Sequence, residues 1–195
     1  METLENTNHG EGGHMEHKIK RLERTLIKRG AILDIYTDRM LLPNGEEEIW
    51  DYVEHRMGAA AVVPVMDDGR ILMVHQYRPA LERATLELPA GSRDSVTEDT
   101  SICAARELEE ETGYRAGKLT KLISLKTTVA FCNESIDVYL AQELTPTKQH
   151  LDAAEEIEVE AFDMEELLRR IYAGEIQDGK TVAGLLAYQN LRNQK

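Results

Sequence analysis

The spacing of apolar residues predicts a chain dominated by strands, with helices in the middle and at the C-terminal end. Segments in which apolar residues alternate with polar ones, or follow one another without a break, predict strands. These segments are residues 32–36, 39–42, 47–55, 59–66, 71–74, 119–128, 136–141 and 156–162. Asn44-Gly45 and Asp68-Gly69 lie between such runs and predict hairpin turns, the second joining its two flanking strands as partners. Residues 18–28 fit either a short helix or an extended lead-in.

A central helix is predicted over residues 99–112, which are good helix formers followed by the stop residue Gly113. At about 100° per residue, one face of this helix gathers three carboxylates: Glu107, Glu110 and Glu111. The opposite side is expected to pack on a sheet through Ala105, Leu108 and Thr112, with Ile102 nearby.

Two further helices are predicted near the C-terminus. Asp163 and Glu166 have the spacing of a capping box for the first, and Gly174 ends it. The second covers residues 178–192 and has an apolar face of Val182, Leu185, Leu186 and Tyr188. This order indicates an α+β domain over residues 57–195, a strand extension over 16–56 and a flexible tail over 1–15.

Composition narrows the class of protein. The chain has 195 residues and a net charge of −13, which opposes binding to nucleic acid. The longest apolar run, residues 57–66, is too short to span a membrane, and the polar start carries no secretory pattern. Cys103 and Cys132 form neither a disulfide framework nor a CxxC metal site. We therefore expect a cytoplasmic protein.

The three carboxylates of the central helix repel one another, and they lie near the negative end of the helix dipole. Arg106 can offset only one of them. A hard divalent cation held among them, magnesium or manganese together with substrate phosphate, would explain the arrangement. A solvated acidic helix face is the alternative, and composition alone leaves the two equally open.

The residues around these glutamates resemble the Nudix box, Gly-x5-Glu-x7-Arg-Glu-U-x-Glu-Glu-x-Gly-U, where U is a bulky apolar residue. The matching residues are Gly91, Glu98 and the run from Arg106 to Tyr114, RELEEETGY. Six residues rather than five separate Gly91 from Glu98, which inserts one residue into the loop and leaves the glutamate face intact. This resemblance favours the metal site over the solvated face.

A wider resemblance covers most of residues 29–190 and is to the ADP-ribose pyrophosphatase branch of that superfamily. Its elements are LPNG at 42–45, QYR at 76–78, LER at 81–83, ELPAG at 87–91 and the loop 128–134. The resemblance implies a mixed-sheet α/β/α sandwich whose N-terminal strands build a homodimer. It also implies magnesium-dependent hydrolysis of a nucleoside diphosphate sugar, with ADP-ribose giving AMP and ribose 5-phosphate.

Other functions stay open. Another nucleoside diphosphate sugar or a dinucleotide is an alternative substrate, because Val129 and Ala130 stand where the branch usually has Pro and Gly. From different classes come a non-catalytic ligand sensor, which would be expected to lose box glutamates, and an acidic scaffold protein. All the box glutamates are present here.

The resemblance also assigns roles at the chemical centre. It makes Glu107, Glu110, Glu111 and the carbonyl of Ala90 the metal ligands, with Glu110 binding directly or through water. Arg106 would orient a box glutamate. Glu134 would take the proton from the attacking water, and a solvated loop acid is its alternative role.

Four residues are predicted to bind substrate on the same basis. Arg78 offers a planar donor fork to a phosphate or ribose group. Glu82 is expected to contact the substrate or the partner subunit, and a solvated position is equally open. Phe131 fits the loop pattern, and Trp50 would stack a base, although an aromatic in a strand more often belongs to a core or an interface.

Overall fold

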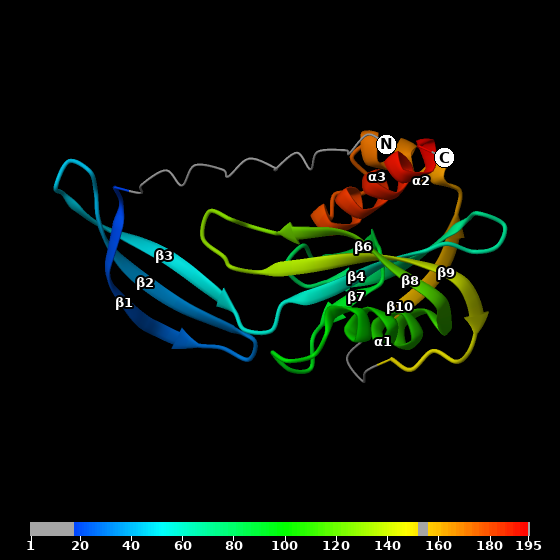
Figure 1. Cartoon of the computed structure of the whole chain (residues 1–195), viewed down its shortest axis with the longest axis horizontal. Coiled ribbons are helices and arrows are strands. Elements are labelled where there is room, and N and C mark those ends of the chain that lie inside the picture. Colours follow the sequence, from blue (N-terminus) through cyan, green and yellow to red (C-terminus); the bar gives the residue numbers. More distant parts are fainter. Residues whose placement is uncertain (1–17, 152–155, 195) are drawn as a thin grey trace, which may run out of the picture.

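The computed structural model describes residues 18–151 and 156–194, which form ten strands and three helices. The tail expected over residues 1–15 lies outside the described residues. Figure 1 shows a layered body that carries both C-terminal helices, and an N-terminal sheet that projects away from it. The two parts are joined where β3 continues into β4.

The N-terminal sheet contains β1 (Lys20–Arg29), β2 (Leu33–Leu41) and β3 (Glu47–His55), which pair antiparallel in that order. Residues 18–28 therefore belong to the extended alternative. The turn at Asn44-Gly45 is confirmed, since Gly45 has a φ of +88° and its N–H donates to the carbonyl of Leu42 at 3.0 Å. Arg24 donates two hydrogen bonds to Asp38, at 2.7 and 2.6 Å, and so ties β1 to β2.

The body contains two sheets. The four-stranded sheet has the order β7 (Ala90–Ser92), β4 (Ala59–Pro64), β9 (Ser135–Pro146), β8 (Tyr114–Lys126), and β4 and β9 run parallel. The three-stranded sheet has the order β10 (Ile157–Phe162), β5 (Ile71–Arg78), β6 (Arg83–Glu87) and is antiparallel. The predicted pairing of 119–128 with 136–141 is confirmed by β8 and β9.

Helices cover both sides of these sheets. Helix α1 (Thr100–Thr112) lies on one side, and α2 (Met164–Tyr172) and α3 (Gly179–Asn193) lie on the other (Figure 1). Strand β4 serves both layers because its side chains alternate. Ala60 and Val62 pack with α1, and Ala61 and Val63 pack in the main core between the sheets and α3.

The predicted partnership of strands 59–66 and 71–74 is wrong. The turn itself forms, since the N–H of Gly69 donates to the carbonyl of Met66 at 2.9 Å. Beyond the turn, the described residues of the two segments are joined by an isolated bridge, Val65 to Ile71, and not by a ladder. Both edges of β4 are already paired, with β7 and β9, so β5 continues into the other sheet.

Three predicted helix details also need correction. Asp163 stands at the N-cap of α2 without a side-chain cap bond, and Glu166 pairs with Arg169 and Arg170 instead of closing a capping box. In α3, Leu186 is exposed, and the buried face consists of Thr181, Gly184, Leu185 and Tyr188.

The packing face of α1 is rotated from the predicted one. Ala105 and Ile102 are exposed, and the helix packs through Cys103, Ala104 and Leu108. The buried face of α1 also contains Glu107 and Glu111, so it combines apolar side chains with two carboxylates.

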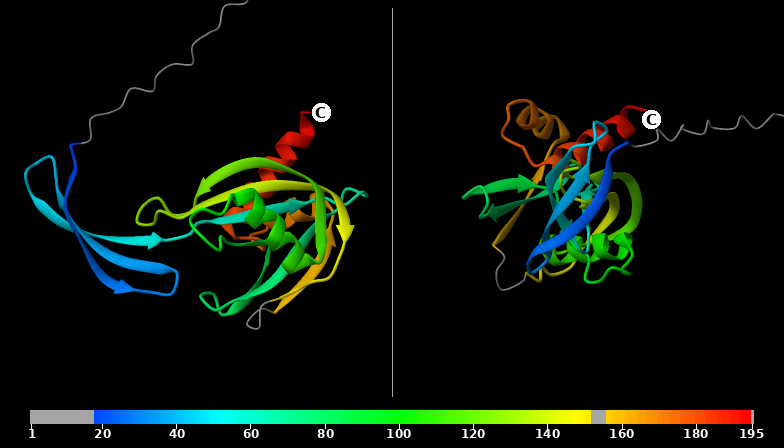
Figure 2. Two further views of the ribbon diagram at one scale, coloured as in Figure 1. Left: turned by 60° about the horizontal axis from the view of Figure 1, so that its bottom comes forward. Right: turned by 90° about the vertical axis from the view of Figure 1, so that its left-hand side faces the viewer.

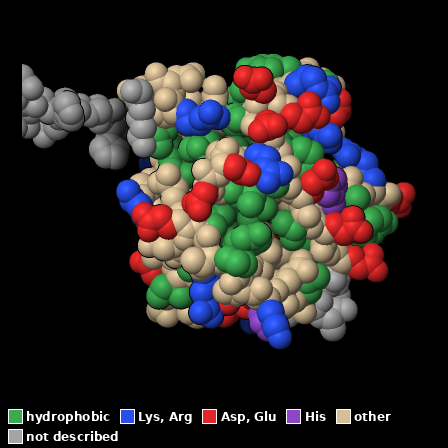
Figure 3. Space-filling view, turned by 90° about the vertical axis from the view of Figure 1, so that its right-hand side faces the viewer, with side chains coloured by type: hydrophobic (Ala, Val, Ile, Leu, Met, Phe, Trp, Pro, Cys, Tyr) green, Lys and Arg blue, Asp and Glu red, His purple; other side chains and the backbone are tan. Residues whose placement is uncertain are grey.

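At the end of the body away from the N-terminal sheet, acidic and basic side chains are interspersed around a patch of apolar atoms (Figure 3). The acidic excess of the chain therefore does not form a single field on this face. Within residues 18–151 and 156–194, no helix is long and apolar enough to cross a membrane.

Candidate active site

Helix α1 holds the glutamates in a fixed register. Asp99 caps its start, where the carboxylate accepts a hydrogen bond from the N–H of Ser101 at 2.8 Å. Gly113 ends it in the left-handed conformation and donates to the carbonyl of Glu109 at 2.9 Å. Cys103 packs in the interface beneath the helix, and burial raises the pKa of its thiol to about 11, which agrees with a packing role.

Two of the three glutamates point toward the short segment 90–92. Glu107 and Glu111 are 8% and 2% exposed, whereas Glu110 is half-buried. The N–H of Ala90 donates to Oε2 of Glu111 at 3.0 Å. A Cβ on Gly91 would lie 2.2 Å from Oε1 of Glu107, so this carboxylate fills the space that any other residue at 91 would need.

Arg106 connects the glutamates to the loop before the helix. Its Nη1 donates to Glu107 at 2.7 Å and to Glu110 at 3.1 Å, and its Nη2 donates to the carbonyl of Ser92 at 3.0 Å. Its Nε lies 3.5 Å from a carboxylate oxygen of Glu98. The extra loop residue therefore does not separate Glu98 from Arg106.

The donor set at this place suits a hard divalent cation. It offers carboxylate oxygens from one helix face beside a glycine-containing backbone segment, and such cations take oxygen ligands. As the side chains stand across the described ranges, no group of three His, Cys, Asp or Glu residues is gathered closely enough to hold an ion. Arg106 instead contacts oxygens of Glu107 and Glu110.

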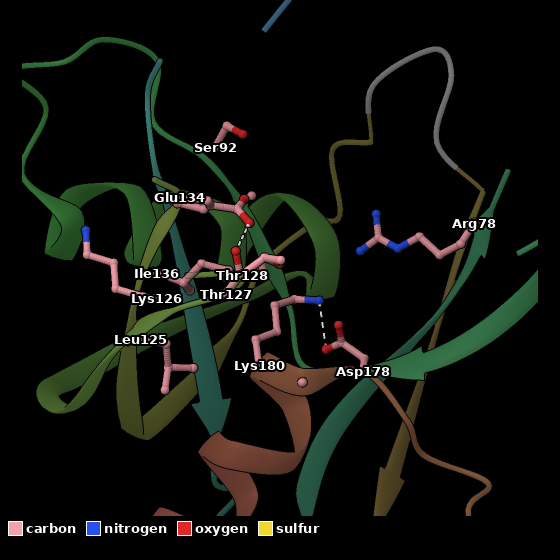
Figure 4. Close-up of a pocket in the computed structure, with 14 residues that line it drawn as sticks. Arg78, Ser92, Leu125, Lys126, Thr127, Thr128, Glu134, Ile136, Asp178 and Lys180 are labelled. Carbon is pink, nitrogen blue, oxygen red and sulfur yellow. Dashed lines mark hydrogen bonds and ion pairs between the residues drawn. The ribbon is translucent and has the colours of Figure 1, made fainter. Parts of the chain in front are cut away.

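A cleft of about 560 Å³ lies beside this segment, a volume usual for a small-molecule site. The backbone of Ala90 and Gly91 forms part of its wall, and through them the cleft adjoins the glutamates. The loop between β8 and β9 contributes Glu134, and Arg78 and Lys180 come from the end of β5 and the start of α3 (Figure 4).

Glu134 is held from two sides. Its Oε2 accepts a hydrogen bond from the Thr127 hydroxyl at 2.6 Å, and its Oε1 lies 3.7 Å from Nε2 of His55. Nδ1 of His55 accepts from the N–H of Gly58 at 2.9 Å, so in the neutral imidazole the proton is on Nε2, facing Glu134. The carbonyl of Phe131 accepts from Val53, which ties this loop to β3.

The structure also brings to the cleft residues that sequence reasoning missed. Glu87, 2% exposed, accepts hydrogen bonds from Nε and Nη2 of Arg78 at 2.7 and 2.6 Å and from the Thr85 hydroxyl at 2.6 Å. The ammonium of Lys180 donates to the same carboxylate and, at 2.9 Å, to Asp178 (Figure 4).

The charge state of this cluster follows from its contacts. Burial alone would raise the pKa of Glu87, but the hydrogen bond from Arg78 and the charge and hydrogen bond of Lys180 outweigh burial and lower that pKa to about 2. A carboxylate inside the otherwise apolar run LEL was the signal that could have singled out Glu87. Lys180 gave no such signal, because its position resembles any polar helix start.

Three predicted substrate residues do not line this cleft. Glu82 is exposed in the turn after β5, with a φ of +53°. Trp50 lies in the N-terminal sheet, 41% exposed, and its Nε1 donates to Glu48 at 2.9 Å. Phe131 is also largely exposed, on the loop that carries Glu134. The structure thus brings Glu107, Glu110, Glu111, Ala90 and Arg106 together, and Arg78 and Glu134 line the adjoining cleft.

Comparisons with known proteins agree with this fold. The sequence profile of the family described as "NUDIX domain" matches residues 55–184. The chain is 40% identical over 164 residues to the "ADP-ribose pyrophosphatase" of Bacillus subtilis (strain 168), covering 83% of this chain and 88% of that one. It is 35% identical over 178 residues to the "Methanol dehydrogenase activator" of Bacillus methanolicus, covering 90% and 94%.

A solved structure has a similar fold. The "Crystal structure of ADP compounds hydrolase" superposes with a TM-score of 0.82, covering 91% of this chain and 96% of the other, at 21% identity. At 21% identity, this structural similarity supports the fold alone. The predicted α+β fold, a mixed-sheet sandwich between helices with an N-terminal strand extension, is confirmed.

Proposed function

Because this chain belongs to the NUDIX family, we propose that it hydrolyses the pyrophosphate bond of a nucleoside diphosphate sugar, with ADP-ribose as the first-choice substrate. The products would be AMP and ribose 5-phosphate. One observation carries the proposal: the helix face of Glu107 and Glu111 adjoins, through Ala90 and Gly91, a cleft whose other wall presents Arg78 and Lys180. A diphosphate in the cleft would meet both.

Hydrolases of this family generally need a divalent metal ion, and we propose magnesium, with manganese as a substitute. Glu107, Glu110, Glu111 and the Ala90 carbonyl would hold it. When bound, the ion supplies neutralisation of the diphosphate charge and activation of water. Arg106 keeps the side chains of Glu107 and Glu110 oriented on the helix, through the hydrogen bonds that it donates to each.

The remaining groups have roles that follow from their contacts. Glu134 takes the proton from the attacking water, and Thr127 and His55 fix its carboxylate for that step. Arg78 uses Nε and Nη2 on Glu87, so Nη1 is the nitrogen that can reach a phosphate in the cleft. Each group thus acts on the diphosphate or on the water that attacks it.

Two features of the chain bear on which nucleoside it accepts. Val129, which is 81% exposed, and Ala130 stand where Pro and Gly are usual in the ADP-ribose branch. Among the residues that the structure describes, none that lines the cleft is aromatic, so they offer no aromatic base-stacking surface there. Another nucleoside diphosphate sugar or a dinucleotide is therefore the second candidate substrate.

Turnover on a substrate panel tests the proposal. Purified protein with magnesium is incubated with ADP-ribose, other nucleoside diphosphate sugars and dinucleotides, and products are separated by chromatography. We expect AMP and ribose 5-phosphate from ADP-ribose in equal amounts. Hydrolysis of no member of the panel would overturn the proposal and favour a ligand-sensing role.

We further propose that residues 16–56 are a dimerisation extension of a catalytic domain over residues 57–195. Apart from the contact of β3 with the loop before β9, the projecting sheet extends away from the body (Figure 2). It exposes a set of large apolar side chains: Leu22, Leu26, Ile27, Ile32, Leu33, Ile35, Ile49 and Trp50. Exposed apolar area of this kind marks an interface, and a three-stranded sheet is more stable when packed.

We propose that a second copy of the chain packs on these apolar side chains. This packing would bring Trp50, Phe131 or Glu82 of one subunit toward the cleft of the other. Light scattering after size-exclusion chromatography is expected to give twice the chain mass of 22.1 kDa, and Ile35→Asp combined with Ile49→Asp to give the monomer. A monomeric wild-type protein would contradict this assembly.

We also propose that the protein is cytoplasmic and that it has no nucleic-acid partner. Cys103 and Cys132 are free thiols, which suits the reducing cytoplasm. The net charge of −13 opposes a nucleic-acid partner. Cell fractionation and a filter-binding assay with duplex DNA test these two statements.

A further inference from the structure

We propose that Lys180 is a substrate-binding residue for the phosphates, and that Glu87 is the positioning residue that holds Lys180 and Arg78 together on the cleft wall. The inference rests on the proposed function and deepens it. It assigns a charged cluster, drawn from β5, β6 and α3, to recognition of a diphosphate.

Two cations share the carboxylate of Glu87. Glu87 ends β6, and its side chain is almost fully buried. One face of the carboxylate receives the guanidinium fork of Arg78, and Lys180 donates to Oε2 from the start of α3. Each cation also lines the cleft. A single buried anion thus fixes where two cations stand.

The start of α3 is attached to this cluster by several hydrogen bonds. Asp178 caps the helix by accepting from the N–H of Thr181 at 3.0 Å, and it also accepts from Lys180 at 2.9 Å. The Thr181 hydroxyl accepts from the N–H of Leu88 at 2.9 Å. Consecutive residues of α3, 180 and 181, therefore contact consecutive residues 87 and 88 of the segment that leads to Gly91.

The charges of Arg78 and Lys180 are placed where a ligand can reach them. A buried ion pair is weak evidence for stability, because apolar residues of similar volume often serve as well. Here the two cations open into a cleft next to the glutamate face, and Glu111 is close enough to Arg78 to raise the pKa of its guanidinium together with Glu87 and Asp178. Two cations that line the same cleft suit a ligand with several negative oxygens.

The experiment compares Lys180→Met, Glu87→Gln and the double variant with wild type. Lys121→Met is the matched control, since Lys121 makes an ion pair with Asp137 at 2.8 Å on β8 and does not line the cleft. Calorimetry measures binding of ADP without metal, and steady-state kinetics with ADP-ribose and magnesium measures KM and kcat. Thermal melting confirms that each variant is folded.

We expect Lys180→Met to weaken ADP binding at least fivefold and to raise KM by a similar factor with little change in kcat. Lys180→Arg should restore most of the binding. Glu87→Gln should weaken binding as much or more, and the double variant should be no weaker than Glu87→Gln alone, because Glu87 acts through the two cations. Lys121→Met should match wild type.

ADP binding within twofold of wild type in folded Lys180→Met, or no measurable ADP binding by wild type, overturns the inference. Additive losses in the double variant overturn the role of Glu87. The two proposals fail separately: hydrolysis of ADP-ribose with an unchanged KM in Lys180→Met refutes only this inference. ADP binding that depends on Lys180 without any turnover refutes only the proposed function.

Discussion

Replacing Gly91 by alanine tests whether the position of the Glu107 carboxylate governs activity. The new Cβ would lie 2.2 Å from Oε1 and 2.4 Å from Oε2 of Glu107. Ordinary van der Waals contact begins at 3.4 Å, so the carboxylate must retreat by more than 1 Å. The clashing atoms belong to the carboxylate of Glu107, at the far end of a flexible side chain, so this side chain can move while the backbone stays in place.

The expected cost follows from this displacement. A misplacement of about 1 Å at a reacting centre can reduce the rate roughly 100-fold, which corresponds to about 3 kcal/mol in the activation barrier. We expect Gly91→Ala to lower kcat on ADP-ribose by about this factor. We also expect its melting temperature to stay within a few degrees of wild type, since neither a cavity nor an unpaired charge is created.

Gly184→Ala is the matched control, because it is the same substitution in the core. Its Cβ would lie 2.7 Å from Leu88 Cδ1 and 3.2 Å from Val138 Cγ1. Overpacking of about 1–3 kcal/mol opposes a helix-propensity gain of about 1 kcal/mol, so the melting temperature should fall by several degrees. Turnover of the folded fraction should be kept. Wild-type kcat in Gly91→Ala, or equal losses of kcat in both variants, would refute the reasoning.

Three further predictions concern the same site. Glu111→Gln should lower kcat at least about 100-fold while the melting temperature stays nearly unchanged; normal turnover in steady-state kinetics would remove Glu111 from the site. Excess EDTA should abolish turnover and added magnesium or manganese should restore it, and activity that survives complete chelation would exclude a metal requirement. The pKa of Glu87 is lowered from 4.5 to about 2, so its contribution to stability, on the order of 3 kcal/mol, is present above pH 4.5 and is lost as the pH falls toward 2. Urea unfolding at pH 7 and pH 3 should therefore show a smaller loss of stability for Glu87→Gln than for wild type, and equal losses would contradict the assigned pKa.

The local parts of the site could be predicted from the sequence. The limits of α1 depend on Asp99 and Gly113, which act on backbone groups within one helical turn. The stripe of Glu107 and Glu111 depends only on their spacing of four residues. The hairpin at Asn44-Gly45 depends on a backbone conformation that glycine adopts at little cost.

Predictions that needed knowledge of neighbours were less successful. Asp163 and Glu166 had the capping-box spacing, yet Asp163 makes no side-chain cap bond. Glu166 forms ion pairs with the arginines one turn further along α2 instead. Leu186 continued an apolar pattern, but the buried face of α3 contains Gly184, where an added Cβ would lie 2.7 Å from Leu88 Cδ1. In both helices the sequence fits more than one local arrangement, and the contacts made in the folded chain determine which one forms.

What the sequence by itself determined is the chemistry of the glutamate helix and the glycine beside it, because those signals lie within a few consecutive residues. Only the tertiary structure decided that β5 would leave β4 for the other sheet, and that Lys180 would meet Glu87 across 93 residues of chain. Such pairings depend on which surfaces remain unfilled once the core has packed, and no local pattern carries that information.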